Sequence, residues 1–206
     1  MFPVSLAEGS FLGAFTALFA VSNPIGCALI YGQMTANLAH RDRAVLSGRI
    51  AINAGIVLIA AMWAGGLVLS SFGIMADSLR IAGGLVISAQ AWRLLGDEAR
   101  DAPAANKMDA LYPLTIPFTT GPGTIAVAIA WGSGKPEGTM EAIAFVSGAT
   151  LAAVAVAASV AVFYGLAHRL IAFLGEGSAR ALMRLSAFLL LCAGIQILGQ
   201  GIKGFA

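Results

Sequence analysis

Six long apolar stretches follow one another along this chain of 206 residues, with short polar connections between them. They span residues 8–34, 50–70, 74–95, 111–132, 140–165 and 182–203. A helix of about 20 mainly apolar residues crosses the hydrocarbon core of a bilayer. Only 11% of the residues are charged, against about 25% in a soluble domain, so lipid must cover most of the surface. The stretches therefore predict an all-α membrane protein with six transmembrane helices.

Several classes of function are disfavoured by the residues that the chain lacks. The net charge is only +2 and no basic stripe is present, so we expect no nucleic-acid partner. Cys27 and Cys192 lie far apart within apolar stretches, which favours packing roles over a disulfide or a metal site. A membrane-embedded enzyme would need a nucleophile, a base or a metal cluster at depth, and no His, Asp or Glu lies there. We therefore expect no enzymatic activity, no metal and no cofactor.

Lysine and arginine residues are divided unequally between the two sides of the predicted bundle. Three connections on one side hold nine of them: Arg41, Arg43, Arg49, Arg93, Arg100, Lys107, Arg169, Arg180 and Arg184. The other side holds Arg80, Lys135 and Lys203. Cytoplasmic connections carry the excess of positive charge in membrane proteins. The distribution therefore predicts a multi-pass protein of a bacterial-type cytoplasmic (inner) membrane, with both termini outside, in the periplasm.

Four aromatic residues fall near the predicted ends of the helices. Trp92, Tyr112 and Tyr164 lie near the inner end, and Trp131 lies near the outer end. Tryptophan and tyrosine are enriched at the two membrane–water interfaces. These positions are typical of an aromatic belt, and packing between helices is the alternative for each of them.

The two halves of the chain resemble each other in sequence. Residues 22–26 (Ser-Asn-Pro-Ile-Gly) match residues 120–124 (Thr-Gly-Pro-Gly-Thr), with the two prolines 98 residues apart. Residues 79–83 likewise match residues 183–187, with the two arginines 104 apart. Three helices per half is an odd number, so the second half would enter the membrane from the opposite side. We predict one transmembrane domain, 1–206, made of inverted three-helix repeats at 1–95 and 111–206, joined by a cytoplasmic loop at 96–110.

A proline-glycine motif interrupts the first helix of each predicted repeat. Pro24 would free the carbonyl of Ala20, and Pro122 would free that of Phe118, because proline has no amide hydrogen. Unpaired backbone groups are costly in lipid unless protein or a watery cavity satisfies them. Two matched breaks therefore predict a polar cavity between broken helices 1 and 4, although each could be a kink stabilised by neighbouring helices. The predicted substrate-binding residues are Ser22, Asn23, Pro24, Ile25, Gly26, Thr119, Thr120, Gly121, Pro122, Gly123 and Thr124, with Asn53 as an additional candidate.

The chemistry of the predicted cavity favours a neutral or zwitterionic solute. All ten acidic residues lie at or beyond helix ends, so a charged solute would lack a counter-ion at mid-membrane depth. Half-helices that begin at the breaks point a positive dipole end at a carboxylate, and the freed carbonyls can accept from an ammonium group. These features suit a small amino acid. The sequence leaves open a channel instead of a carrier, coupling to H⁺ or Na⁺, and the oligomeric state.

Three motifs together resemble the MarC family of integral membrane proteins. They are Asn-Pro-Ile-Gly at residues 23–26, Leu-Arg-Ile-Ala-Gly-Gly at 79–84, and Pro-Leu-Thr-Ile-Pro-Phe-Thr-Thr-Gly-Pro-Gly at 113–123. The resemblance extends over essentially the whole chain. It implies a secondary transporter that moves small neutral amino acids such as alanine, glycine and serine by alternating access, with the substrate between the broken helices. The alternative is a channel or an exporter for another small polar or amphiphilic solute.

This chain departs from the family pattern at two places. Family members often continue the first motif with Asn-Ile-Pro, where this chain has Cys-Ala-Leu at residues 27–29. They often have small aliphatic residues where this chain has Phe-Thr-Thr at residues 118–120. The added hydroxyl groups of the second motif bear on which substrate side chains are accepted.

Overall fold

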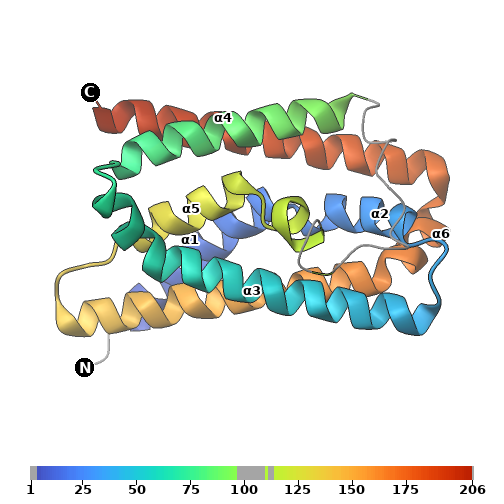
Figure 1. The fold of residues 1–206 in the computed structure, drawn as a ribbon, viewed down its shortest axis with the longest axis horizontal. Coiled ribbons are helices and arrows are strands. Elements are labelled where there is room, and N and C mark those ends of the chain that lie inside the picture. The colour runs from blue at the N-terminus through green and yellow to red at the C-terminus, as the bar shows by residue number, and fades with distance from the viewer. Residues whose placement is uncertain (1–3, 97–109, 111–113, 206) are drawn as a thin grey trace.

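In the computed structural model, the described residues are 4–96, 110 and 114–205, and they form helices joined by short turns, with no β-strand among them. The helices run along the long axis of the molecule, and the described segments near the two chain ends lie at the same end of the bundle (Figure 1). The helices are α1 (Val4–Ser22), α2 (Pro24–Met34), α3 (His40–Ser71), α4 (Ala76–Leu95), η3 (Leu114–Thr119), α5 (Pro122–Gly132) and α6 (Thr139–Phe205).

Within the part of the chain that the structure describes, four helical stretches are long and apolar enough to cross a membrane. These are Val4–Met34, His40–Ser71, Thr139–Gly175 and Gly177–Phe205, and α5 is a shorter apolar helix. The all-helical membrane fold is therefore confirmed. The inverted repeat of six helices stays a prediction, as does the division into 1–95, 96–110 and 111–206. Most of the 96–110 connection lies outside the described residues.

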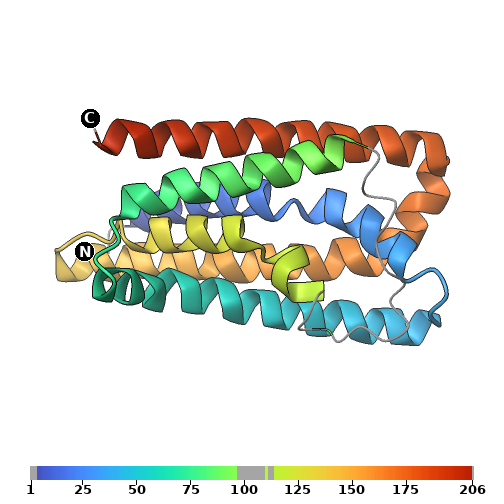
Figure 2. The ribbon, with the colours of Figure 1, turned by 45° about the horizontal axis from the view of Figure 1, so that its top comes forward.

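The structure contains the two helices predicted at 140–165 and 182–203, but the loop predicted between them is wrong. Helix α6 continues past residue 165 and changes direction at Gly175, where φ is 72° and ψ is 162°. Glycine reaches positive φ without the steric cost that a Cβ would add. One residue therefore turns the chain, and the N-terminal segment (Thr139–Gly175) and the C-terminal segment (Gly177–Phe205) remain helical on either side (Figure 2).

Helix α3 begins at His40, well before the start at residue 50 that the apolar stretch predicted. The added turns, residues 40–49, contain charged residues, so they were not part of the apolar stretch. Asp42 lies in the first turn of α3, where a negative charge is favourable to the helix dipole. The polar end of α3 is therefore helical and extends beyond the apolar stretch.

Small residues bring α4 close to two other helices. A Cβ at Gly84 would lie 2.7 Å from the carbonyl oxygen of Gly194 in the C-terminal segment, and a Cβ at Gly83 would lie 2.6 Å from the Cβ of Ala126 in α5. Glycine allows backbones to approach in this way in membrane helix pairs. The glycines of α4 therefore let it pack between α5 and the C-terminal segment, and this placement sets the walls of the candidate site.

We predict that Gly194→Leu destabilises the bundle, because a Cβ at this position would lie 2.5 Å from the hydroxyl oxygen of Ser88 on α4. Overpacking of this kind typically costs about 1–3 kcal/mol. Thermal unfolding of the detergent-solubilised protein measures the change. Gly199→Leu on the same segment is the matched control, because a Cβ there has no neighbour within 4 Å. Equal unfolding temperatures for Gly194→Leu and Gly199→Leu would contradict the close contact between α4 and the C-terminal segment.

Candidate functional site

The first break in the helices is formed by Asn23, which lies between α1 and α2. Asn23 has a φ of 43° and a ψ of 57°, and it is the one non-glycine residue with positive φ in the described part of the chain. Asparagine tolerates this left-handed conformation better than most residues. Its Oδ1 accepts a hydrogen bond of 3.2 Å from the amide of Gly26, which caps the new helix.

The residues around Asn23 complete this break. Pro24 occupies the first turn of α2, where its missing amide hydrogen leaves no helical bond unmade. Gly26 is buried, and a Cβ there would lie 2.5 Å from the Asn23 side-chain nitrogen. Asn23, Pro24 and Gly26 therefore end one helix and start the next, as the predicted break in helix 1 requires.

The second break has a different construction, with a wide helical turn before it. In η3 the amide of Thr120 donates to the carbonyl of Thr115, five residues earlier, at 2.8 Å. The hydroxyls of Thr115, Thr119 and Thr120 also donate to carbonyls five residues earlier, at 2.6, 2.7 and 3.1 Å. Gly121 is extended, and Pro122 begins α5. The threonine hydroxyls therefore add second hydrogen bonds to carbonyl groups of the wider turn, such as those of Ala110 and Thr115, which already accept backbone amides.

The predicted site residues lie at the two breaks, and most of them are buried. The buried ones are Ser22, Pro24, Gly26, Thr119, Thr120, Gly121, Gly123 and Thr124. Asn23, Ile25 and Asn53 are half-buried, and Pro122 is exposed. Asn53 lies on α3, which packs against both η3 and α5. Substrate binding by these twelve residues stays a prediction.

A buried tyrosine cluster (Tyr31, Tyr164 and Thr119) joins the α2 and η3 sides of the two breaks. The rings of Tyr31 on α2 and Tyr164 on α6 stack with centroids 4.7 Å apart. The hydroxyl oxygens of Tyr164 and Thr119 are 2.9 Å apart. Because the Thr119 hydroxyl already donates to Leu114, Tyr164 is the donor in this pair. The cluster thus connects α2, α6 and η3 through side chains.

Tyr164 follows the alternative of packing between helices, because only 2% of its surface is exposed. Its helical spacing from Val160 and Ala167, which are also buried, is the sequence signal that could have indicated this. Trp92 is exposed on α4, and Tyr112 lies outside the described residues. Trp131, expected near the outer interface, lines a cavity.

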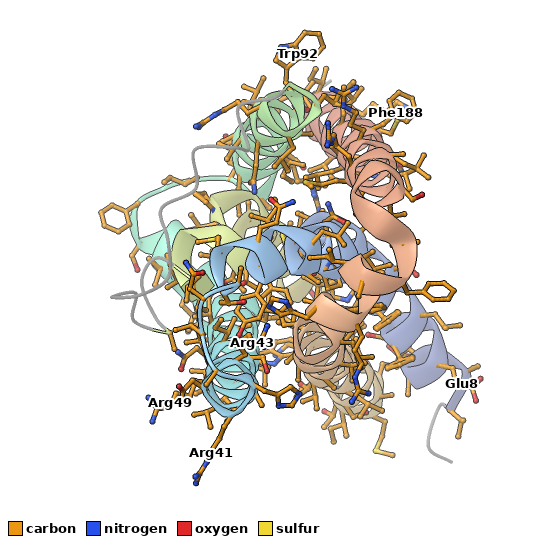
Figure 3. The ribbon with its side chains drawn as sticks, turned by 90° about the vertical axis from the view of Figure 1, so that its right-hand side faces the viewer. Glu8, Arg41, Arg43, Arg49, Trp92 and Phe188 are labelled. Carbon is orange, nitrogen blue, oxygen red and sulfur yellow. The ribbon has the colours of Figure 1, made fainter. Side chains whose placement is uncertain are left out.

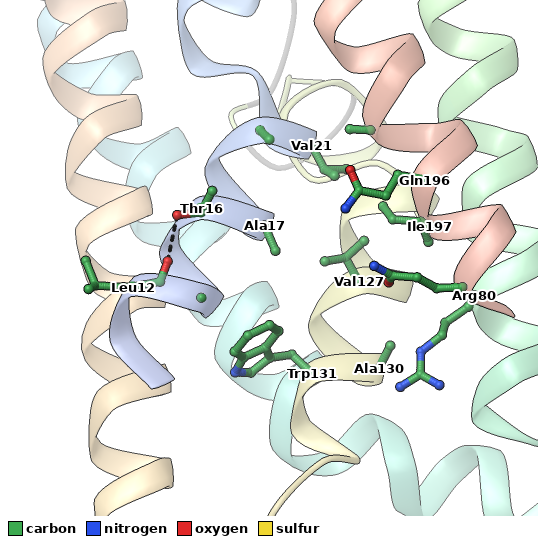
Figure 4. Close-up of a pocket in the computed structure, with 14 residues that line it drawn as sticks. Leu12, Thr16, Ala17, Val21, Arg80, Val127, Ala130, Trp131, Gln196 and Ile197 are labelled. Atoms are coloured by element: carbon green, nitrogen blue, oxygen red, sulfur yellow. Dashed lines mark hydrogen bonds between the residues drawn. The ribbon is translucent and has the colours of Figure 1, made fainter. Parts of the chain in front are cut away.

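This cavity has a volume of about 670 Å³ and lies between α1, α4, α5 and the C-terminal segment of α6 (Figure 4). On α1 its lining ends with Ala20 and Val21, directly before Ser22. On α5 its lining extends from Val127 to Trp131. Among the described residues, none of the twelve predicted site residues lines it. The cavity therefore approaches the breaks from the end of the bundle at which α1 starts and α6 ends.

The two sides of the breaks differ in packing. On one side, α1 and α5 border the cavity. On the other side, residues of α2 and η3 belong to a buried cluster with α6, which contains Cys27, Tyr31, Leu114 and Tyr164. A cavity thus lies on the chain-end side of the breaks, and buried side chains fill the opposite side. In the described part of the chain, no group of three or more His, Cys, Asp or Glu side chains could hold a metal ion.

Comparison with known proteins is consistent with the membrane fold. The sequence profile of the MarC family of integral membrane proteins matches residues 9–206. The inner membrane protein MarC of Citrobacter koseri is 31% identical over 207 residues, covering 90% of each chain. The proteins of the same name from Escherichia coli and Salmonella typhimurium are 30% and 28% identical, again over 90% of each chain. No solved structure matches the chain. The chain therefore belongs to the MarC family and is a multi-pass protein of the inner membrane.

Proposed function

We propose that this protein is a secondary transporter that moves small neutral amino acids, of the alanine, glycine and serine type, by alternating access. The observation that carries the proposal is the asymmetry about the two breaks. A cavity approaches them from one side, and the tyrosine cluster closes the other side. A carrier needs one such closure at a time, whereas an open channel needs a path through both sides.

The backbone at the breaks supports a zwitterionic substrate. Helices α2 and α5 both begin at a break, so both direct the positive ends of their dipoles toward it. Helix α1 ends at Ser22 and offers carbonyl groups from its last turn. An α-carboxylate and an α-ammonium group would find complementary partners there without a charged side chain. We therefore place the substrate between the broken helices α1–α2 and η3–α5, and we propose no enzymatic activity.

The tyrosine cluster would be the inner closure of this carrier. Its position follows from the proposed orientation, in which both termini lie in the periplasm. Arg41, Arg43 and Arg49 lie near the start of α3, at the end of the bundle opposite the described segments near the chain ends (Figure 3). With that end in the cytoplasm, the cavity lies on the periplasmic side of the breaks. Transport would then require the Tyr164–Thr119 hydrogen bond to break.

The orientation gives a labelling prediction. In a background with both native cysteines replaced, Lys135→Cys should react with an impermeant maleimide added to intact cells. Arg41→Cys should react only after the membrane is permeabilised, because the positive end of the bundle stays inside. The reverse pattern would contradict the proposed orientation.

Transport itself is tested by counterflow. Proteoliposomes preloaded with unlabelled alanine should accumulate labelled alanine saturably, and glycine or serine should compete. Proton and sodium gradients, imposed separately, would identify a coupled ion. Counterflow no greater than in empty liposomes would exclude the proposed substrates, and single-channel current would favour the channel alternative.

The same assay connects transport to the breaks through one matched pair of variants. In Pro122→Ala the added amide allows α5 to continue into the preceding turn, which removes a penalty of about 3 kcal/mol on a continuous helix. Transport should fall about tenfold or more while membrane insertion is retained. Pro136→Ala, in the connection before α6, should leave transport unchanged.

The inner closure is tested by Tyr164→Phe. The variant keeps the stacked ring but loses the hydrogen bond to Thr119, which is worth about 1 kcal/mol. Reaction of the buried Cys27 with a permeant maleimide should become about fivefold faster. Cys192, which is exposed, is the internal control and should react at its original rate. An unchanged Cys27 rate would contradict a gating role for Tyr164.

A further inference from the structure

Polar side chains gather on one wall of the cavity. Arg80 comes from α4, and Gln196 and Gln200 come from the C-terminal segment of α6. The two glutamines are four residues apart, so they lie on one face of their helix. The facing wall is apolar, with alanine and valine side chains of α1 and α5 (Figure 4). The cavity is therefore polar on one wall and apolar on the other.

Arg80 is the only charged residue among the described residues that line the cavity. Its Nη1 contacts the carboxylate of Asp77, one turn earlier on α4. Asp77 does not line the cavity, and about a third of the Arg80 side chain stays exposed. A guanidinium has five N–H donors in a fixed fork, so the contact with Asp77 orients the group and leaves donors for a second acceptor.

The contact with Asp77 accounts for the presence of an arginine in an apolar chain, but it does not account for the two glutamines. Gln196 and Gln200 have no hydrogen-bond partner among the described residues and are exposed at the cavity. Each amide group supplies two further N–H donors to the cavity. The Thr16 hydroxyl, in contrast, already donates to the carbonyl of Leu12 at 2.7 Å. On the polar wall, the donors with free capacity thus belong to Arg80, Gln196 and Gln200. The buried indole N–H of Trp131, on α5, also has no partner among the described residues.

We propose that Arg80 and Gln200 form a docking site for the carboxylate of an incoming solute, distinct from the substrate site at the breaks. Gln196 lies farther along the cavity, and the Arg80 guanidinium points away from it (Figure 4). Arginine binds carboxylates through two parallel hydrogen bonds, and the Gln200 amide can donate to the same carboxylate. The alanine and valine side chains of the facing wall suit a short apolar body. The ligand class is a small carboxylate with a neutral, short side chain.

The size and depth of the cavity fit a docking step. Pockets of about 300–1,000 Å³ hold drug-sized ligands, so an alanine-sized solute fills only part of 670 Å³. The cavity ends at Ala20 and Val21, beside the first break. A carboxylate bound at Arg80 would therefore lie between the outside and the breaks. The direction of travel rests on the proposed function, whereas binding of a carboxylate does not require transport.

Trp131 lines the same cavity and can report binding without any transport. The protein with Trp63→Phe and Trp92→Phe, in detergent at constant ionic strength, has Trp131 as its single tryptophan. Alanine and propionate should each give a saturable fluorescence change. Alaninamide, which lacks the carboxylate, and chloride should give none. Binding of alaninamide as tight as that of alanine would overturn the proposal.

Two variants test which side chains donate hydrogen bonds to the carboxylate. Arg80→Gln should weaken propionate binding about tenfold or more, because hydrogen bonds to charged groups are the stronger class. Gln200→Met keeps the volume, leaves the Arg80–Asp77 pair intact, and should weaken binding about threefold or more. Arg41→Gln, at an exposed position near the start of α3, is the matched control and should bind as the parent does. Unchanged binding in both Arg80→Gln and Gln200→Met would overturn the docking site.

The outcomes for the two proposals are separable. Saturable carboxylate binding that depends on Arg80, together with absent counterflow, would contradict the transporter and retain the docking site. Alanine counterflow whose KM is unchanged in Arg80→Gln would retain the transporter and overturn the docking site. A KM that rises about tenfold, with the maximal rate kept, is the result expected if both hold.

Discussion

Inside a membrane, a backbone group that loses its helical partner has no water to replace it. At both breaks of this protein, side chains form hydrogen bonds with the backbone. At the first, the carboxamide of Asn23 caps α2 through the amide of Gly26. At the second, the hydroxyls of Thr115, Thr119 and Thr120 return to carbonyls of the widened turn. Because these hydrogen bonds join residues that are close in sequence, two apolar helices can be interrupted without water to cap the helix ends.

The breaks in turn divide the bundle into two unlike ends. Toward the chain ends, the glycine contacts of α4 fix it beside α5 and the C-terminal segment, and a cavity remains between these helices and α1. Toward the other end, the Tyr31–Tyr164 stack and Thr119 fill the corresponding space. Thr119 therefore has two roles. Its hydroxyl donates to the carbonyl of Leu114 in its own turn, and it also accepts the hydrogen bond that would hold the inner side closed.

The breaks were predictable from sequence, whereas the cavity and the tyrosine cluster were not. Pro24 and Pro122 each remove an amide hydrogen, and that consequence does not depend on the rest of the fold. The burial of Tyr164 depends on which face of α6 turns inward. In a membrane protein, the face of a helix that packs inward and the face that contacts lipid are both apolar. Hydropathy therefore does not show which residues are buried. The turn at Gly175 was missed because apolar length identifies spans and not the helical residues beyond them.

The central claim is that closure alternates between the two ends of one bundle, and spin-label distances at both ends test it most directly. In a protein without native cysteines, one label pair at Glu8 and Lys203 flanks the cavity, and a second pair at Asn37 and Phe173 flanks the tyrosine cluster; all four positions are exposed. Saturating alanine should shift the first pair toward shorter distances and the second toward longer ones. Distributions that stay unchanged at both ends would contradict the account.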